Sequence, residues 1–289
     1  MALGKYADFN FGALATLSGG ADWSADLPLA NMQAAERYLT HPARQLAADT
    51  LASSQFDATL DRARKVSLVG LTFHTLSMLA QYRLTIAPIG GSFAAPALQT
   101  AWTLVFPRLY DSSLLDWYSP NWWTGQATQE DIDLYPRHLW IPLETPIAAS
   151  AVRIEIDDHL NPAGYVDIGG LWLSGTWSPI FNHERGRERG REGRDLRDET
   201  PSGRLITEAR RGRRTQAFTW AGLTDGEADM VTDMAARAEG GRAVVFLPDA
   251  DDVGSIAREG FLAEATFKGP TLTYSYLNAA SGLLKEIIA

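Results

Sequence analysis

Residues 117–123 hold the side chains best suited to ligand chemistry in this chain of 289 residues. Aromatic rings stack on the apolar faces of sugars, and nearby amides or carboxylates, such as those of residues 121, 130, 131 and 133, bond sugar hydroxyls. Large aromatic side chains more often cover a domain or fill a protein interface, and that interpretation is favoured here. A sugar site is the alternative, with five candidate residues: Trp117, Tyr118, Asn121, Trp122 and Trp123.

Residues 182–214 form an arginine-rich segment with eleven arginines against seven acids, so their net charge is +4, and the remaining chain has −13 of the total of −9. Because acids and bases alternate, the segment favours a linker or an extended hairpin that turns at residues 200–203 and bridges subunits. Guanidinium groups bind carboxylates on adjacent chains in pairs of bonds. The arginines expected at an assembly interface are Arg185, Arg187, Arg189, Arg191, Arg194, Arg210, Arg211, Arg213 and Arg214.

Catalytic and metal-binding motifs are not found in the sequence. It has no Gly-x-Ser-x-Gly elbow, no His-Glu-x-x-His and no phosphate-binding loop, and its five histidines lie far apart. The absence of cysteine excludes disulfides and thiolate ligands. The acidic run 249–254 lacks the later ligands of a calcium loop, and Asp157 and Asp158 are interpreted as turn residues. We therefore expect no enzyme, no cofactor and no metal site.

Three parts are expected along the chain, and residues 1–26 are an N-terminal arm or a first edge strand. Residues 27–180 are all β, with strands near 55–60, 66–73, 81–87, 152–156 and 166–173. Turns are expected at 61–64 and 157–164. A change of phase at Gly169-Gly170 predicts a β-bulge in the last of these strands.

Residues 181–289 are expected to form the charged segment followed by a second β-rich domain. Strands are expected near 216–220, 243–247, 261–267 and 271–277, with 283–288 closing the sheet. Thr224 and Glu227 have the spacing of a capping box, which predicts one helix that ends at Gly240-Gly241. The third part therefore combines a sheet with one α-helix.

The first domain resembles the galactose-binding-like, or discoidin-like, jelly-roll sandwich as found in phage tail proteins. The motifs shared with that family occur in the family's order at residues 27–31, 56–60, 63–66, 122–123, 153–158 and 161–169. The second domain resembles, in its pattern, the sheet-and-helix unit of tail-tube and distal-tail proteins. Together these resemblances imply a mainly β chain: a galactose-binding-like sandwich plus a second β-rich domain with one α-helix.

The resemblance also implies a function. Such proteins are structural virion proteins of the tail tip or baseplate of long-tailed phages. They act by oligomeric assembly, as a trimer or hexamer ring, and dock other phage tail proteins. It implies a location in the tail of the virion after assembly in the host cytoplasm. The sugar-binding name of the fold transfers no sugar site.

Charge and hydropathy limit the classes of partner that we expect. An acidic chain is a poor non-specific nucleic-acid binder, so no nucleic acid is expected. No apolar run reaches the roughly 18 residues of a membrane span, and residues 1–8 do not read as a signal peptide. The rival function is a carbohydrate-binding or host-receptor-binding module of the same particle, with a host surface glycan as its partner. That rival rests on the aromatic cluster at residues 117–123.

Overall fold

The computed structural model describes residues 3–33, 40–133, 137–183, 186–199, 203–274 and 277–288. The chain divides into two compact units. We call the first the sandwich unit, which comprises Phe9–Thr176 and Ala250–Gly260. The second, the hairpin unit, comprises Met1–Asp8, Trp177–Asp249 and Phe261–Ile288.

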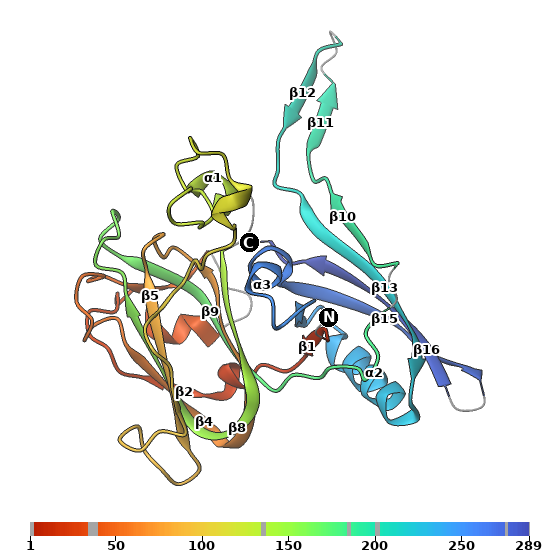
Figure 1. Ribbon diagram of the computed structural model, residues 1–289, viewed down its shortest axis with the longest axis horizontal. Helices are drawn as coiled ribbons and strands as arrows, with labels where there is room; N and C mark the ends of the chain where they lie inside the picture. The colour runs from red at the N-terminus through yellow and green to blue at the C-terminus, as the bar shows by residue number, and fades with distance from the viewer. Residues whose placement is uncertain are drawn as a thin grey trace. The chain divides into compact units, whose positions relative to one another are not determined.

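The sandwich unit is built on antiparallel strands in the order β3-β9-β4-β8-β5-β6, with β2 paired to β4 and β7 to β5. The strands are β2 (Thr16–Ser18), β3 (Ala43–Gln45), β4 (Phe56–His74), β5 (Gln81–Pro88), β6 (Leu98–Gln99), β7 (Thr103–Leu104), β8 (His138–Asp157) and β9 (Val166–Ser174). Strands β4 and β8 are long and strongly curved (Figure 1), so they pass through both layers around one core. The helical segments are η1 (Phe11–Leu14), η2 (Leu29–Gln33), η3 (Ser112–Leu114), α1 (Gln129–Asp133) and α3 (Val253–Glu259).

Residue patterning explains the core of this unit. In β8, Val152, Ile154 and Ile156 alternate with polar residues, as the sequence predicts, and all three are buried. Strand β9 is buried at every one of its nine positions; β3 and β4 pair with its edges, and η1 and η2 contact it as well. Residues 157–164 form the predicted turn, with Gly164 at a φ of +73°. Asp158 stabilises that turn by accepting bonds from Ser77 and Asn161.

Two local predictions in this unit are wrong. No bulge occurs at Gly169-Gly170, since β9 pairs with β4 in unbroken register from Ile168 to Ser174. The apparent change of phase arises because β9 is buried on both faces, where alternation has no meaning. The turn expected at residues 61–64 lies inside β4, which continues to His74 with a register shift against β8 between Thr59 and Arg64.

The hairpin unit contains a six-stranded antiparallel sheet in the order β1-β14-β15-β16-β13-β10, and a separate two-stranded pair, β11-β12. The strands are β1 (Lys5–Ala7), β10 (Glu188–Glu192), β11 (Leu196–Glu199), β12 (Leu205–Glu208), β13 (Arg213–Leu223), β14 (Ala243–Leu247), β15 (Phe261–Tyr274) and β16 (Leu277–Glu286). Helix α2 (Asp225–Ala238) packs on one face of the sheet, chiefly against β15. Strand β1 makes the start of the chain an edge strand of this sheet, and β2 belongs to the other unit.

The capping box that begins α2 is confirmed. The hydroxyl of Thr224 accepts from the backbone amide of Glu227, and the Glu227 carboxylate accepts from that of Thr224. The helix ends before Gly240 and Gly241, both at positive φ, as predicted. Its buried residues join an aromatic core around Trp220 and Phe246.

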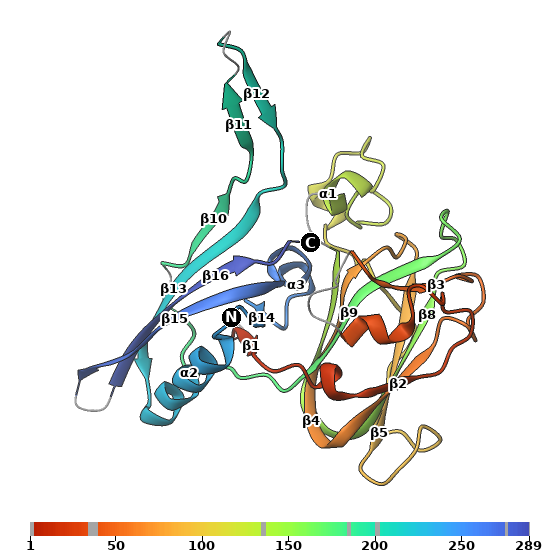
Figure 2. The ribbon, with the colours of Figure 1, turned by 180° about the vertical axis from the view of Figure 1, so that it is seen from behind.

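The arginine-rich segment is an extended hairpin, one of the two forms that the sequence left open. Strand β10 pairs with the start of β13, and beyond them β11 pairs with β12. Figures 1 and 2 show from both sides that β11 and β12 run beyond the end of the six-stranded sheet. Of the predicted turn at 200–203, residues 200–202 lie outside the described residues, and Gly203 has a φ of +80°.

The fold class is therefore mainly β, a sandwich plus a second β-rich unit, as predicted. Within the described part of the hairpin unit, α2 is the one α-helix. The expected boundaries, 1–26, 27–180 and 181–289, differ from the division between the two units. The acidic run at 249–254 leads into α3, where Asp252 is the helix N-cap and accepts from the amide of Gly254.

Candidate functional site

The aromatic loop, residues 105–128, connects β7 to α1 and is stabilised by its own backbone. The carbonyl of Gly125 accepts from the amides of Leu109 and Tyr110, at 2.8 and 2.9 Å. Gly125 has a φ of +63°, and a Cβ there would lie 2.5 Å from the carbonyl oxygen of Tyr110. A side chain at position 125 would therefore disrupt the loop. The Gln126 side chain, which is buried, donates to the carbonyl of Phe106 at 2.8 Å.

The five predicted binding residues lie together at the end of this loop, but Asn121 serves the loop itself. Its side-chain amide donates to the carbonyl of Gln126 at 2.7 Å, and its backbone carbonyl accepts from the amide of Gly125 at 2.7 Å. That bond uses one of the two N–H donors of the side-chain amide and ties it to the loop. Asn121 is therefore better suited to shaping the loop than to recognising a sugar.

The three tryptophan rings pack against one another. The ring centroids of Trp122 lie 4.8 Å from those of Trp117 and 4.6 Å from those of Trp123, at interplanar angles of 60° and 90°. Trp117 and Trp123 are 6.4 Å apart at 58°. The contacts of Trp122 with the other two rings are edge-to-face, so the three rings form a compact apolar knob.

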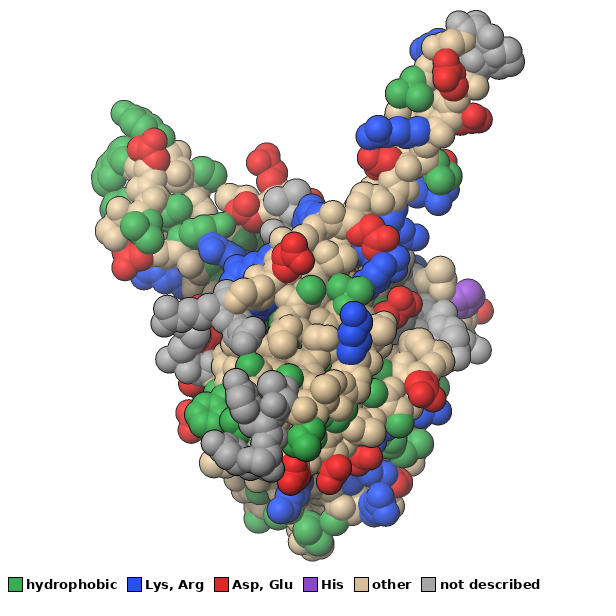
Figure 3. Space-filling model, turned by 90° about the vertical axis from the view of Figure 1, so that its right-hand side faces the viewer, with side chains coloured by type: hydrophobic (Ala, Val, Ile, Leu, Met, Phe, Trp, Pro, Cys, Tyr) green, Lys and Arg blue, Asp and Glu red, His purple; other side chains and the backbone are tan. Residues whose placement is uncertain are grey.

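Two tryptophans of the knob, and two further apolar residues of the aromatic loop, are nevertheless unusually exposed. The exposed fractions of Leu114, Tyr118 and Trp123 are 81%, 89% and 80%, and that of Trp117 is 64%. Figure 3 shows hydrophobic side chains gathered over the lobe at the upper left of that view. A contiguous apolar surface of this kind, on a loop that is already ordered, is typical of a docking site.

Helix α1 supplies the acidic residues that could have formed a polar rim. Asp131 accepts bonds from the amide and the hydroxyl of Thr128, at 3.0 and 2.9 Å, and so stabilises the first turn of α1. These bonds hold the pKa of Asp131 below its usual value. Asp133 is bonded to Arg137 at 2.8 Å. Both carboxylates therefore have structural partners within the sandwich unit.

The hairpin tip, β11 and β12, is the second exposed region. Leu196, Leu205 and Ile206 are 50%, 59% and 54% exposed. In the register of the pair, Leu196 and Ile206 lie on one face of the ribbon, and Leu205 lies on the other. Figure 3 shows side chains of both charges along the projecting hairpin, at the upper right. A two-stranded ribbon without a core is marginally stable alone, so this tip is suited to being covered by a partner.

The predicted interface arginines differ in their position on the hairpin and in the residues that they contact. Near the base of the hairpin, Arg213 bonds Glu192 at 2.8 Å, and Arg214 is buried and donates from Nε to Glu286 at 2.9 Å. Arg210 bonds Glu208 at 2.9 Å. Arg189 and Arg191 lie on β10, Arg187 and Arg194 lie just before and after it, and Arg211 lies between β12 and β13. Arg185 lies outside the described residues. Because Arg214 is buried in its own sheet, it offers no exposed guanidinium to an adjacent chain.

The described residues contain no group of three or more His, Asp or Glu side chains placed to hold a metal ion. No helix in the described part of the chain is both long enough and apolar enough for a membrane span.

No protein-family model matches this chain, and neither does any curated protein. Among solved structures, it is similar to the family 32 carbohydrate-binding module of NanJ from C. perfringens in complex with galactose. That match has 14% identity and a TM-score of 0.37, and covers 59% of this chain and 99% of the module. A second family 32 module from Clostridium perfringens, in complex with GlcNAc-α-1,4-galactose, has 14% identity, a TM-score of 0.34, and coverage of 58% and 94%.

Recombinant discoidin II of Dictyostelium discoideum is also similar, with 12% identity, a TM-score of 0.28, and coverage of 96% of this chain and 97% of discoidin II. The sequence predicted a galactose-binding-like, or discoidin-like, sandwich, and these three structures are of that kind. None of the three is a phage tail protein. Because each of these three TM-scores is below 0.5, proposals for this chain rest on its own geometry.

Two residues that shape the aromatic loop were not predicted from the sequence. Leu114 extends the exposed apolar surface, and Gln126 supports the loop from beneath. Leu114 lies within three residues of Trp117, so a search for clustered apolar residues in a polar loop could have found it. Gln126 has no such signal, because its role depends on the carbonyl of Phe106, twenty residues earlier.

Proposed function

We propose that this protein is a structural virion protein of the tail tip or baseplate of a long-tailed phage. It assembles into a homo-oligomeric ring and docks neighbouring tail proteins. The observation that supports this proposal best is the hairpin tip, which exposes Leu196, Leu205 and Ile206 on a ribbon with no core beneath it. A ribbon of this kind gains stability when an adjacent chain covers it.

The base of the hairpin supports the same mechanism. Arg213 lies between Glu192 and Glu264, at 2.8 and 3.9 Å, and Lys285 adds a bond to Glu192 at 3.2 Å. Bonds from Arg213 and Lys285 hold the pKa of Glu192 below its usual value. The base is therefore attached to its own sheet, so the tip is presented as an arm that an adjacent copy can bind.

Residues 193–212, which include the hairpin tip and are called the arm here, can be removed without interrupting the six-stranded sheet. Glu192 and Arg213 are directly paired, so replacing residues 193–212 by Asn-Gly closes β10 and β13 with a two-residue turn. We expect the full chain to form a ring by size-exclusion chromatography with light scattering, and the shortened chain to be a monomer with an unchanged circular dichroism spectrum. A monomeric full chain at tens of micromolar, or a ring that survives the replacement, would contradict assembly through the arm.

A matched pair of variants tests which side chains matter. Replacing Leu196, Leu205 and Ile206 by Ser should weaken the oligomer at least about tenfold, since three exposed apolar contacts are lost. Replacing three equally exposed apolar residues of the sandwich unit by Ser is the control: Leu46, Leu79 and Ile89. If the two triple-Ser variants weakened the oligomer equally, the hairpin tip would not be the contact between copies.

The location in the virion has its own test. In particles of the phage that encodes this chain, a tag on the protein should be labelled by antibody at the tail end distal to the head. Particles without label, or label on the capsid alone, would contradict the proposed position while leaving the oligomer result unaffected.

The second candidate is a carbohydrate-binding or host-receptor-binding module, and the exposure of Trp123 and Tyr118 favours it. Replacing Trp122 and Trp123 by Ala should then abolish binding to host cells or to a glycan array while the oligomer stays intact. Under the first proposal, the same variant keeps cell binding unchanged and loses a neighbouring tail protein in co-purification. Because the three tryptophan rings pack on one another, we expect the result of the first proposal, in which a neighbouring tail protein is lost.

A further inference from the structure

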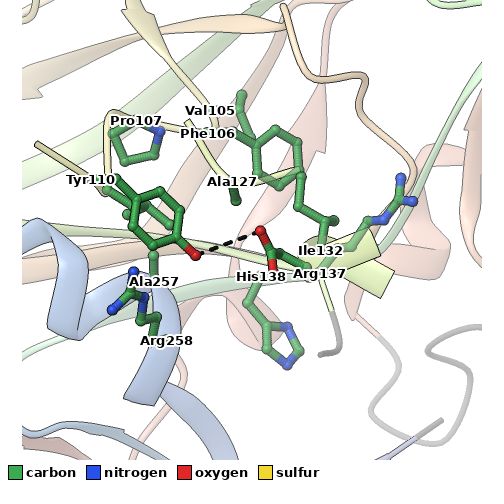
Figure 4. Close-up of a pocket in the computed structure, with 12 residues that line it drawn as sticks. Val105, Phe106, Pro107, Tyr110, Ala127, Ile132, Arg137, His138, Ala257 and Arg258 are labelled. Carbon is green, nitrogen blue, oxygen red and sulfur yellow. Dashed lines mark hydrogen bonds between the residues drawn. The ribbon is translucent and has the colours of Figure 1, made fainter. Parts of the chain in front are cut away.

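A cavity of about 170 Å³ lies within the sandwich unit, between the aromatic loop and helix α3 (Figure 4). It is partly open, and one part of its lining is apolar, with Val105, Phe106, Ala127 and Ile132. Proteins usually contain few voids larger than a water molecule, so a hollow of this size departs from ordinary packing. For scale, an engineered apolar cavity of roughly 150 Å³ binds benzene. The cavity is therefore large enough for one six-membered ring.

The charged side chains at the cavity balance one another. Arg137, which lines it, is bonded to Asp133 at 2.8 Å. The guanidinium of Arg258, on α3, lies 4.6 Å from the ring centroid of Tyr110. The Tyr110 hydroxyl donates to Asp131 at 3.5 Å, as the dashed line in Figure 4 shows. Two guanidiniums therefore face two carboxylates, and these four groups carry no net charge.

His138, which also lines the cavity, is placed as a neutral imidazole. Its Nδ1 accepts from the backbone amide of Phe73 at 3.4 Å, which requires an unprotonated nitrogen. A charged ligand would lose its hydration here without an opposite charge in excess. The lining therefore favours a neutral molecule.

Asp131 has one acceptor left for such a molecule. Its Oδ2 accepts from the amide and the hydroxyl of Thr128 and from the hydroxyl of Tyr110. Its Oδ1 accepts no hydrogen bond from any residue that the structure describes. The bonds from Thr128 lower the pKa of Asp131, so the carboxylate is ionised near neutral pH and accepts strong bonds from hydroxyl groups. Because Asp131 lines the cavity, a ligand hydroxyl can donate to Oδ1.

We propose that this cavity binds a small neutral aromatic molecule with one hydroxyl group, of the size of phenol. The ring packs against Phe106 and Ile132, and the hydroxyl donates to Oδ1 of Asp131. This site is separate from the aromatic knob and the hairpin tip, so it does not depend on the proposed assembly.

Phenol is the probe that tests the proposal, with toluene as the analogue of nearly equal shape that lacks a donor. Titration of the full chain with phenol at millimolar concentration should shift the amide resonances of residues 105–132 and 253–259. A hydroxyl that is buried without a partner costs free energy, so a cavity without an acceptor would favour toluene, by about tenfold. We expect phenol to bind more tightly than toluene. No detectable phenol binding, or toluene binding as tightly as phenol or more tightly, would overturn the proposal.

Benzoate tests the preference for a neutral molecule. Its ring is that of phenol, but its carboxylate brings a charge that the balanced lining does not neutralise, so it should bind at least about tenfold more weakly. Benzoate binding as tightly as phenol would show that the cavity selects an anion, and would overturn the proposal.

Two variants with matched controls locate the site. Asp131→Asn should weaken phenol about tenfold and leave toluene unchanged, with Asp111→Asn as control because Asp111 accepts from Ser113 in the same loop but outside the lining. Ala257→Phe, at an exposed position of the lining, should abolish the binding of both compounds by filling the cavity. Its control is Ala236→Phe, at an exposed position of α2. Phenol binding that is unchanged in both lining variants, or weakened equally in the controls, would place the ligand elsewhere and overturn the proposal.

Discussion

The aromatic loop and the hairpin tip both expose apolar side chains, but what supports each of them differs. The loop has Gln126 beneath it, a network of backbone bonds around Gly125, and three rings that pack on one another. The described part of the tip is held by the pairing of β11 with β12 and by bonds from Arg210 to Asp195 and Glu208, and its apolar residues lie on both faces. The loop therefore has its own support before any partner binds, whereas under the proposed assembly the tip gains stability when a partner covers it.

This difference predicts different binding behaviour. A preorganised knob loses little conformational entropy on docking, so its contacts contribute directly to affinity. A ribbon that becomes ordered on binding loses more, and needs a larger covered area for the same affinity. The four predictions below test this contrast, beginning with the base of the hairpin, where the largest effect is expected.

The buried pair at the base of the hairpin should be far more sensitive than any position at the tip. Arg214→Met leaves the Glu286 carboxylate, whose side chain is 2% exposed, without its guanidinium, which costs about 3–5 kcal/mol of unfolding free energy. Arg197→Met, on exposed β11, should change it by less than about 0.5 kcal/mol. Urea unfolding of both variants, followed by far-ultraviolet circular dichroism, checks the contrast. Equal losses would mean that the tip is as firmly packed as the base.

Acid should destabilise the sandwich unit, which contains the aromatic loop, because His74 is buried in it. Burial, and secondarily the charge of Arg137, lowers the pKa of His74 to about 3. The unfolded chain takes up a proton below about pH 6.5, and the folded unit excludes it until about pH 3. Stability therefore falls as pH falls through this window, by up to about 1.4 kcal/mol per pH unit.

The variant His74→Gln should flatten that dependence between pH 6 and pH 4. Thermal unfolding measured at half-unit steps of pH checks it, with His159→Gln as the control because the His159 side chain is 59% exposed. A slope that is the same in wild type and His74→Gln would mean that other groups cause the acid sensitivity.

Removing the support of the aromatic loop should cost less than breaking the buried pair. Gln126→Leu removes the bond to the carbonyl of Phe106 and leaves that acceptor without its donor, at a cost of about 1–3 kcal/mol. Amide exchange should accelerate in residues 105–128 and stay unchanged in β11 and β12. Equal acceleration in both regions would contradict the view that the loop has its own support.

Local signals in the sequence predicted the local structure well. The capping box at Thr224 acts over three residues, and the alternation in β8 reports one buried face, so neither depends on distant contacts. The hairpin could be anticipated because alternating charges and glycines disfavour helix. The bulge at Gly169-Gly170 failed because a strand buried on both faces loses its alternation.

Features that depend on tertiary contacts could not be predicted. The seven residues of α3 are too few for a clear helical period, and their place in the sandwich unit is set by packing. The aromatic cluster itself was found, but its exposure was not, since the same sequence could equally cover a core. The burial of Arg214 among its arginine neighbours likewise follows from the register of β13 with β16, which puts it on the core face.

The smallest stability effects are expected at the outermost residues of both regions, where they test the contrast most directly. Tyr118→Ser and Leu205→Ser remove side chains that are 89% and 59% exposed, so each should change the unfolding free energy of the isolated chain by less than about 0.5 kcal/mol. On assembly the two should diverge. In the oligomer, Leu205→Ser should lower the midpoint of thermal unfolding in a concentration-dependent way, since it weakens a contact between copies. Tyr118→Ser should leave that midpoint unchanged, because under the proposed function the aromatic loop docks a different protein. A concentration-dependent shift for Tyr118→Ser would place the knob, too, at the contact between copies, and would remove the distinction between the two regions.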